Sequence, residues 1–208
     1  MKSDLIRALA ASDIFRDYER AFSAATGLPL SLSGPDSWQL VHQGKKTQNP
    51  FCEMMAETNC SCASCLEMQE KLRIGAKESA RTEKCALGML DSAVPVKLGS
   101  EVIGFLQTGQ IFCRKPTAAQ FARISKKLAG WGIAPDARVE SAYFATKVMT
   151  PAQYASMVEL LTIFSQHLSL VANQVAVLQE NAEPPMITRA KSFIKENQTE
   201  DLTLGQVA

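Results

Sequence analysis

The feature that most constrains the fold of this chain is a long apolar helix expected from Thr150-Pro151 to Asn181. Its apolar residues recur at steps of three and four, the spacing of a sustained heptad seam. The seam residues are Tyr154, Met157, Leu161, Phe164, Leu168, Val171, Val175 and Leu178. A second stripe beside the seam contains Val158, Leu160, Ile163, Leu170 and Val177.

One face of this helix can therefore cover the chain's own sheet while the other meets a partner chain. We expect a homodimer through helix 151–181, with the heptad seam, including Leu161 and Leu168, as its interface. Burial of the whole helix within one subunit is the alternative.

The residues before this helix alternate between helical and strand patterns. Ser12-Asp13 is typical of a helix start and Gly27 of a helix end. Further helices are expected at 49–55, 58–77 and 117–130, and strands at 28–32, 38–42, 84–90, 92–98 and 102–112. The turn residues 33–36 predict a hairpin of the first two strands, Gly99-Ser100 predicts a second hairpin, and 131–149 reads as irregular.

This order of elements predicts an α/β fold of the α+β kind, with an antiparallel sheet, flanking helices and the long C-terminal helix. Gly104 and Gly109 interrupt the last strand, which favours bulges or close approach of the backbone to another element.

The cysteines are unevenly placed, since Cys60, Cys62 and Cys65 lie within six residues. Clustered sulfurs bind metal, titrate redox state or fill a core, and all three readings stay open. For ligation, we expect zinc or an iron–sulfur cluster on Cys52, Cys60, Cys62, Cys65 and Cys85, with the sulfurs converging at one end of the sheet. Cys113 is the cysteine left out of that set.

Composition places the chain among ordinary globular proteins, with 46% hydrophobic residues and a formal net charge of +1. The charge is too small for the basic footprint of a complete nucleic-acid-binding domain. The N-terminus lacks the apolar stretch of a signal peptide, and no run of roughly 18 apolar residues suggests a membrane span. We therefore expect a cytoplasmic protein that binds no membrane.

Catalysis is not expected. A cysteine nucleophile usually needs a base, and the two histidines, His42 and His167, lie in no cysteine–histidine motif. The expected strands instead suggest a small, mostly apolar ligand cavity, lined by Leu87, Met89, Val94, Val96, Phe105, Gln107 and Phe112. Alcohols, diols or short acids would suit it equally well. We expect ligand contacts at Cys85, Leu87, Met89, Asp91, Phe105, Gln107 and Gln110.

The C-terminal residues form a fresh amphipathic helix from Ile187 to Asn197, followed by Leu202-Thr-Leu-Gly-Gln-Val-Ala. This tail resembles the start of the DNA-binding domain of AraC-type transcription regulators. The apolar pattern stops before its partner helices, so the DNA-binding head is expected to be truncated, and DNA is expected as a partner only of a full-length protein.

The middle of the chain resembles the sensory domain named after the regulator PocR. The matching segments are Phe51-Cys52, Cys65, 84–96, Gly104 and Gly109-Gln110. The resemblance implies a PAS-like sensor that binds a small organic effector and controls an AraC-type head. It carries over the recurring cysteines and the sheet motif onto Cys52, Cys65, Cys85, Asp91, Pro95, Gly109 and Gln110.

The match departs from the family at Ala86, where the family has a histidine, and at Cys60 and Cys62, which are additions. The expected domains are 1–182 for the sensor and 183–208 for the linker and the first part of the head.

Overall fold

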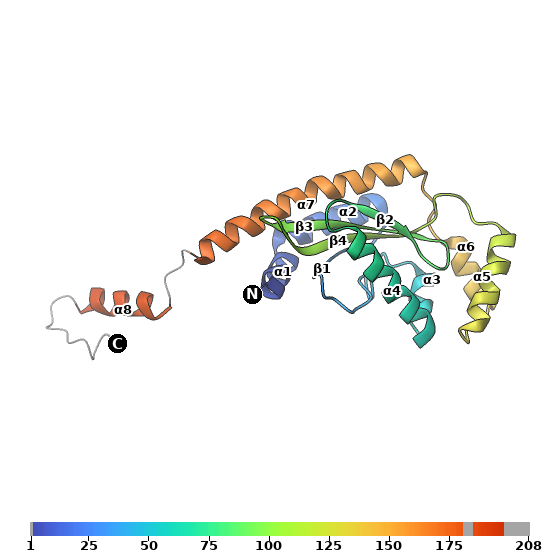
Figure 1. Ribbon diagram of the computed structural model, residues 1–208, viewed down its shortest axis with the longest axis horizontal. Coiled ribbons are helices and arrows are strands. Elements are labelled where there is room, and N and C mark those ends of the chain that lie inside the picture. Colours follow the sequence, from blue (N-terminus) through green and yellow to red (C-terminus); the bar gives the residue numbers. More distant parts are fainter. Residues whose placement is uncertain (1, 181–184, 198–208) are drawn as a thin grey trace. The chain divides into compact units, whose positions relative to one another are not determined.

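The structure, a computed structural model, describes residues 2–180 and 185–197 (Figure 1). The chain divides into two compact units, Met1–Ala172 and Asn173–Ala208. The first unit holds the sheet and most of the helices. The expected helix-turn-helix start at 202–208 lies outside the described residues.

The core of the first unit is a four-stranded antiparallel sheet in the order β1-β4-β3-β2. Its strands are β1 (Leu30–Ser33), β2 (Arg81–Lys84), β3 (Leu90–Leu98) and β4 (Glu101–Ile111). With its flanking helices, this sheet confirms the α+β fold class. The hairpin between β3 and β4 turns at Gly99, whose φ is 59°, as the sequence predicted.

Two strand predictions were wrong. Residues 38–42 form no strand, and β1 pairs with β4 instead of closing a hairpin with its own neighbour. Long-range pairing with a buried central strand outweighed the local turn chemistry of 33–36. The predicted strand 84–90 is divided by a turn at Cys85–Gly88, where Gly88 has a φ of 96°.

Helices cover both faces of the sheet (Figure 1). On one face lie α2 (Asp13–Thr26) and α7 (Pro151–Glu180), and the Tyr18 ring of α2 stacks on Phe164 of α7. On the other face lies α4 (Asn59–Gly75), whose Leu72 packs with Phe105 of β4. Side chains alternate along a strand, so each strand contributes residues to both layers.

The remaining helices close the ends of the unit. They are α1 (Lys2–Ala11), α3 (Pro50–Met55), α5 (Ala118–Gly130) and α6 (Ala137–Ala145). The caps predicted for α2 are present, because Ser12 Oγ accepts from Phe15 N and Gly27 has a φ of 64°. The irregular stretch predicted for 131–149 was wrong, since Asp136 caps α6 by accepting from two backbone N–H groups.

The heptad seam of α7 belongs to the core of its own subunit. Tyr154, Met157, Leu161, Phe164 and Leu168 are all buried, and Ser165 Oγ donates to the Pro95 carbonyl of β3. The prediction that Leu161 and Leu168 form a subunit interface was therefore wrong. Their heptad spacing serves packing on the sheet, whereas Leu160, Ile163 and Leu170 of the second stripe are exposed.

The sequence predicted no membrane span, but α7 meets the length and composition criteria for one. Pro151–Val177 is long and apolar enough to cross a membrane by length and composition, with a mean hydropathy of 1.3 in its best window. Core helices of globular proteins meet the same criteria, and one face of α7 is buried on the sheet. In the second unit, α8 (Pro185–Glu196) confirms the amphipathic helix expected there.

Candidate functional site

The site is built where one face of α4 meets the sheet. Gln69 and Arg73 lie one helical turn apart on α4 and are only 8% and 6% exposed. They flank Leu72, which packs on Ala93 and Phe105 of the central strands. The α4 face thus presents polar groups to the sheet beside an apolar contact.

The sheet also presents polar side chains to α4. Ser31 of β1 pairs across the sheet with Gln107 of β4, so their side chains share a face. Gln107 lies two residues beyond Phe105 and therefore also faces α4. Gln107 is 2% exposed, and its Oε1 accepts from Ser33 Oγ at 3.1 Å.

His42 and Asp91 form the centre of this polar layer. His42 is 2% exposed, and its Nδ1 lies 3.0 Å from Ser31 Oγ. Its Nε2 lies 3.9 Å from Asp91 Oδ1, too far for a hydrogen bond. Burial lowers the pKa of His42 to about 3 and raises the pKa of Asp91 to about 7. At neutral pH the histidine is uncharged, and the carboxyl is close to its own midpoint.

Three cysteines lie around Asp91. Burial raises the pKa of Cys52, Cys65 and Cys85, and the charge of Asp91 raises all three further. The Cys65 thiol reaches a pKa of about 12. Cys52 Sγ donates to Met89 Sδ at 3.6 Å. These thiols therefore stay protonated and neutral at physiological pH.

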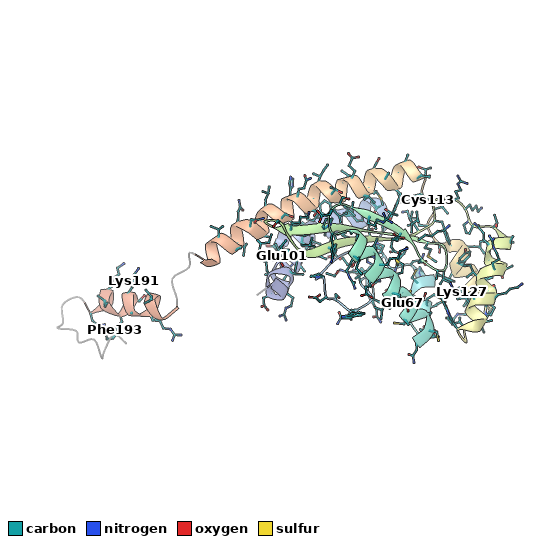
Figure 2. All side chains as sticks on the ribbon, viewed as in Figure 1. Glu67, Glu101, Cys113, Lys127, Lys191 and Phe193 are labelled. Carbon is teal, nitrogen blue, oxygen red and sulfur yellow. The ribbon has the colours of Figure 1, made fainter. Side chains whose placement is uncertain are left out.

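The other cysteines lie apart from this group. Cys60 is exposed, and Cys62 lines a cavity of about 770 Å³ between α1, residues 33–43 and α4. Cys113 follows β4, and Figure 2 shows it at the opposite end of that strand from Glu101. In residues 2–180 and 185–197, no three His, Cys, Asp or Glu side chains form a group that could hold a metal ion. The structure therefore does not gather the predicted ligand set Cys52, Cys60, Cys62, Cys65 and Cys85 into one group.

A bulge in β4 packs against the backbone of Asp91. Gly109 has a φ of 153°, and a Cβ there would lie 2.5 Å from Asp91 Cα. Gln110 follows with a φ of 60°, and its Oε1 accepts from the backbone N of Asn49 at 2.8 Å. The glycine thus serves close backbone approach, as the sequence suggested, while the Gln110 side chain ties down the start of α3.

The remaining predicted ligand residues are divided among separate places. Leu87, Met89 and Phe112 belong to an aromatic core with Phe51 and Tyr143. Cys85 and Leu87 also border a cavity of about 590 Å³ near α5. Val94 and Val96 lie on the α7 face, because Ser92 bonds to Tyr154 of α7 and side chains alternate along β3. The single cavity predicted from these residues was therefore wrong, and only Asp91, Phe105 and Gln107 share the α4 face.

Four buried polar atoms in this layer have no hydrogen-bond partner in the described part of the chain. They are His42 Nε2, Gln69 Oε1, Arg73 Nη1 and Gln107 Nε2. Buried polar groups are almost always paired, and leaving one unpaired costs about 1–3 kcal/mol. The layer is therefore chemically equipped to hydrogen-bond a small polar molecule.

Sequence reasoning missed four residues of this layer: Ser31, His42, Gln69 and Arg73. His42 was weighed only as a catalytic base on a strand that does not form. Cys65, Gln69 and Arg73 recur every four residues along α4, and that spacing was the signal that could have placed them on one face.

Comparison with known protein families finds one match. The family described as "Sensory domain found in PocR" matches residues 9–173, which include the whole sheet and every residue of the polar layer. No curated protein and no solved structure matches the chain significantly.

Proposed function

This chain belongs to the PocR sensory-domain family, and we propose that it senses a small organic effector bound between α4 and the sheet. A sensory domain points to a role in binding rather than catalysis. In this proposal the domain serves a cytoplasmic transcription regulator and controls an AraC-type DNA-binding head, which supplies the DNA contacts.

The observation that carries the proposal is the set of four unpartnered buried atoms, on His42, Gln69, Arg73 and Gln107. Ligand sites are mostly apolar with a few placed polar groups. Phe105, Ala93 and Leu72 supply the apolar part here. A metal or iron–sulfur sensor is less well supported, because the described cysteines form no ligand group.

A route from this layer to α7 runs through the sheet. Asp91 and Gly109 face the polar layer, and their neighbours Ser92 and Thr108 face α7. Ser92 Oγ lies 2.8 Å from Tyr154 Oη, which donates to the Thr108 carbonyl at 3.4 Å. An effector that moves β3 against β4 would change the packing of α7, provided that it binds two arrangements with different affinity.

The exposed stripe of α7 supports a homodimer. Leu160, Ile163 and Leu170 are 57%, 48% and 63% exposed, and they follow heptad spacing with His167 between them. The same stripe on a second copy is complementary to it, because two parallel helices related by two-fold symmetry bring identical positions together. Dimerisation would place two signalling helices side by side.

A thermal-shift screen of small alcohols, diols and acids tests the proposal. A ligand at 100 times its Kd stabilises the folded state by about 2.7 kcal/mol, which raises the melting temperature by several degrees. Gln107→Met keeps the side-chain length but removes the amide, so we expect it to weaken binding of any hit about tenfold.

The matched control is Gln39→Met, since Gln39 is exposed and lines the separate cavity beside α1. It should leave the affinity unchanged. An effector that binds Gln107→Met as tightly as the wild type, but loses affinity in Gln39→Met, would move the site to that other cavity.

A further inference from the structure

Arg73 is the most unusual member of the polar layer, because a guanidinium cannot become neutral on burial. The residue is 6% exposed and its Nη1 has no hydrogen-bond partner in the described part of the chain. A buried charge of this kind calls for an anionic partner. An anionic partner has room to bind there, because Arg73 lines a cavity of about 530 Å³.

This cavity has apolar walls suited to a hydrocarbon side chain. Phe105 forms its floor and is fully buried, whereas Trp38 is 67% exposed at its rim. Ile74 and Val102 complete the apolar surface. Glu101 also lines the cavity. Figure 2 shows Glu101 at the end of the sheet away from Cys113.

The charges around Arg73 select among ligand classes. Burial lowers the pKa of Arg73, and the carboxylates of Glu70 and Asp36, which line the cavity, offset part of that lowering. Lys77 and Glu78 also line it. A simple anion would be repelled by these carboxylates as well as attracted by Arg73, and an uncharged alcohol would offer the unpartnered Arg73 Nη1 no anionic acceptor.

We propose that this cavity binds a zwitterionic amino acid with an apolar side chain. Its carboxylate pairs with Arg73, its ammonium faces Asp36 and Glu70, and its side chain lies between Phe105 and Trp38. Arginine suits this task because its planar fork donates two parallel hydrogen bonds to a carboxylate. The inference rests on the proposed sensing function and names the class of its effector.

Isothermal titration of the whole chain with L-phenylalanine, L-leucine and L-methionine tests the assignment. Two analogues of phenylalanine test separately whether each charged group is needed for binding: 3-phenylpropionate lacks the ammonium, and phenethylamine lacks the carboxylate. We expect an amino acid to bind and its two single-charge analogues to bind at least tenfold more weakly.

Variants locate the binding groups. Arg73→Gln should weaken amino-acid binding at least tenfold and leave phenethylamine binding unchanged. Asp36→Asn, in an exposed loop, should weaken the amino acid while leaving 3-phenylpropionate unchanged, and it remains informative if Arg73→Gln does not fold. Arg20→Gln, at an exposed arginine paired with Asp17 on α2, is the control and should change nothing.

Two results would overturn the assignment. One is equal affinity for 3-phenylpropionate and phenylalanine; the other is no binding by any of the three amino acids. If a different effector is found whose binding depends on Gln107 but not on Arg73, the amino-acid inference fails and the sensing function stands. If no small molecule binds, both fail.

Discussion

Burial reverses the ordinary ionisation of two neighbouring residues, Asp91 and His42. The carboxyl holds its proton up to a pKa of about 7, and the imidazole stays neutral down to a pKa of about 3. An isolated buried charge is costly, so both groups favour their neutral forms. The neutral His42 imidazole, whose Nε2 has no hydrogen-bond partner in the described part of the chain, is therefore well suited to hydrogen-bond a ligand.

Replacing Asp91 with asparagine should stabilise the protein more at neutral than at acidic pH. Above its ordinary pKa of 3.8 the unfolded carboxyl ionises, but the folded one keeps its proton until about pH 7. Wild-type stability therefore falls through this window by about 1.4 kcal/mol per pH unit, on the order of 4 kcal/mol in all. The asparagine side chain of the Asp91→Asn variant exchanges no proton, so the advantage of the variant should grow across the same window.

Urea denaturation of both proteins at pH 4.5 and 7.5 measures this difference. His42 titrates in the opposite sense between its pKa values of about 3 and 6.5. Its contribution occurs in both proteins and cancels in the comparison. An equal free-energy difference at the two pH values would show that the Asp91 pKa is not raised.

Gly109→Ala should destabilise the protein by about 2–4 kcal/mol. Its new Cβ would lie 2.5 Å from both Asp91 Cα and Asp91 Oδ1, and its φ of 153° is strained for alanine. Gly130→Ala is the matched control, because nothing lies within 4 Å of its Cβ position. Thermal melting should separate the two variants clearly; similar melting temperatures would mean that the bulge adapts easily.

At the scale of elements, the ends of helices were predictable because their signals are local. Ser12, Thr117 and Gly27 act through hydrogen bonds or φ angles within a few residues. The partner of β1 was not predictable in this way, since β1 pairs with β4 more than 70 residues later. The seam of α7 was recognised by its spacing, but spacing alone does not distinguish a subunit's own sheet from a partner helix.

The two stripes of α7 should respond differently to charge. Leu160→Glu combined with Leu170→Glu should yield monomers with a nearly unchanged melting temperature, because both side chains are exposed. Leu161→Glu should instead unfold the domain, because residue 161 is fully buried and an unpaired buried carboxylate costs several kcal/mol. Sedimentation velocity and circular dichroism check both outcomes; dimers that persist in the double variant would exclude this stripe as the interface.

At the scale of the whole molecule, the α+β class, the antiparallel sheet and the long helix followed from the sequence. The site followed only in part. Asp91, Phe105 and Gln107 were among the expected contacts, but His42, Gln69 and Arg73 were not. His42 comes from a loop without regular structure. Gln69 and Arg73 are polar residues of α4, whose spacing places them on one face without showing that this face is buried.

The two faces of the sheet thus differ in chemistry, one suited to ligand binding and the other to packing of α7. The α4 face carries unpaired polar groups, and the α7 face carries an apolar helix hydrogen-bonded to the same strands. Because the side chains of β3 and β4 alternate between these faces, neighbouring residues belong to both layers. A ligand that moves the strands from one side would therefore act on the helix that the same strands contact on the other side.

The most direct test of this account is a crystal structure of the domain with an effector identified by titration. We expect ligand density between α4 and the sheet, within hydrogen-bond distance of at least one of His42 Nε2, Gln69 Oε1, Arg73 Nη1 and Gln107 Nε2. Density confined to the cavity between α1 and α4, or to the one beside α5, with these four atoms still unpaired, would contradict it.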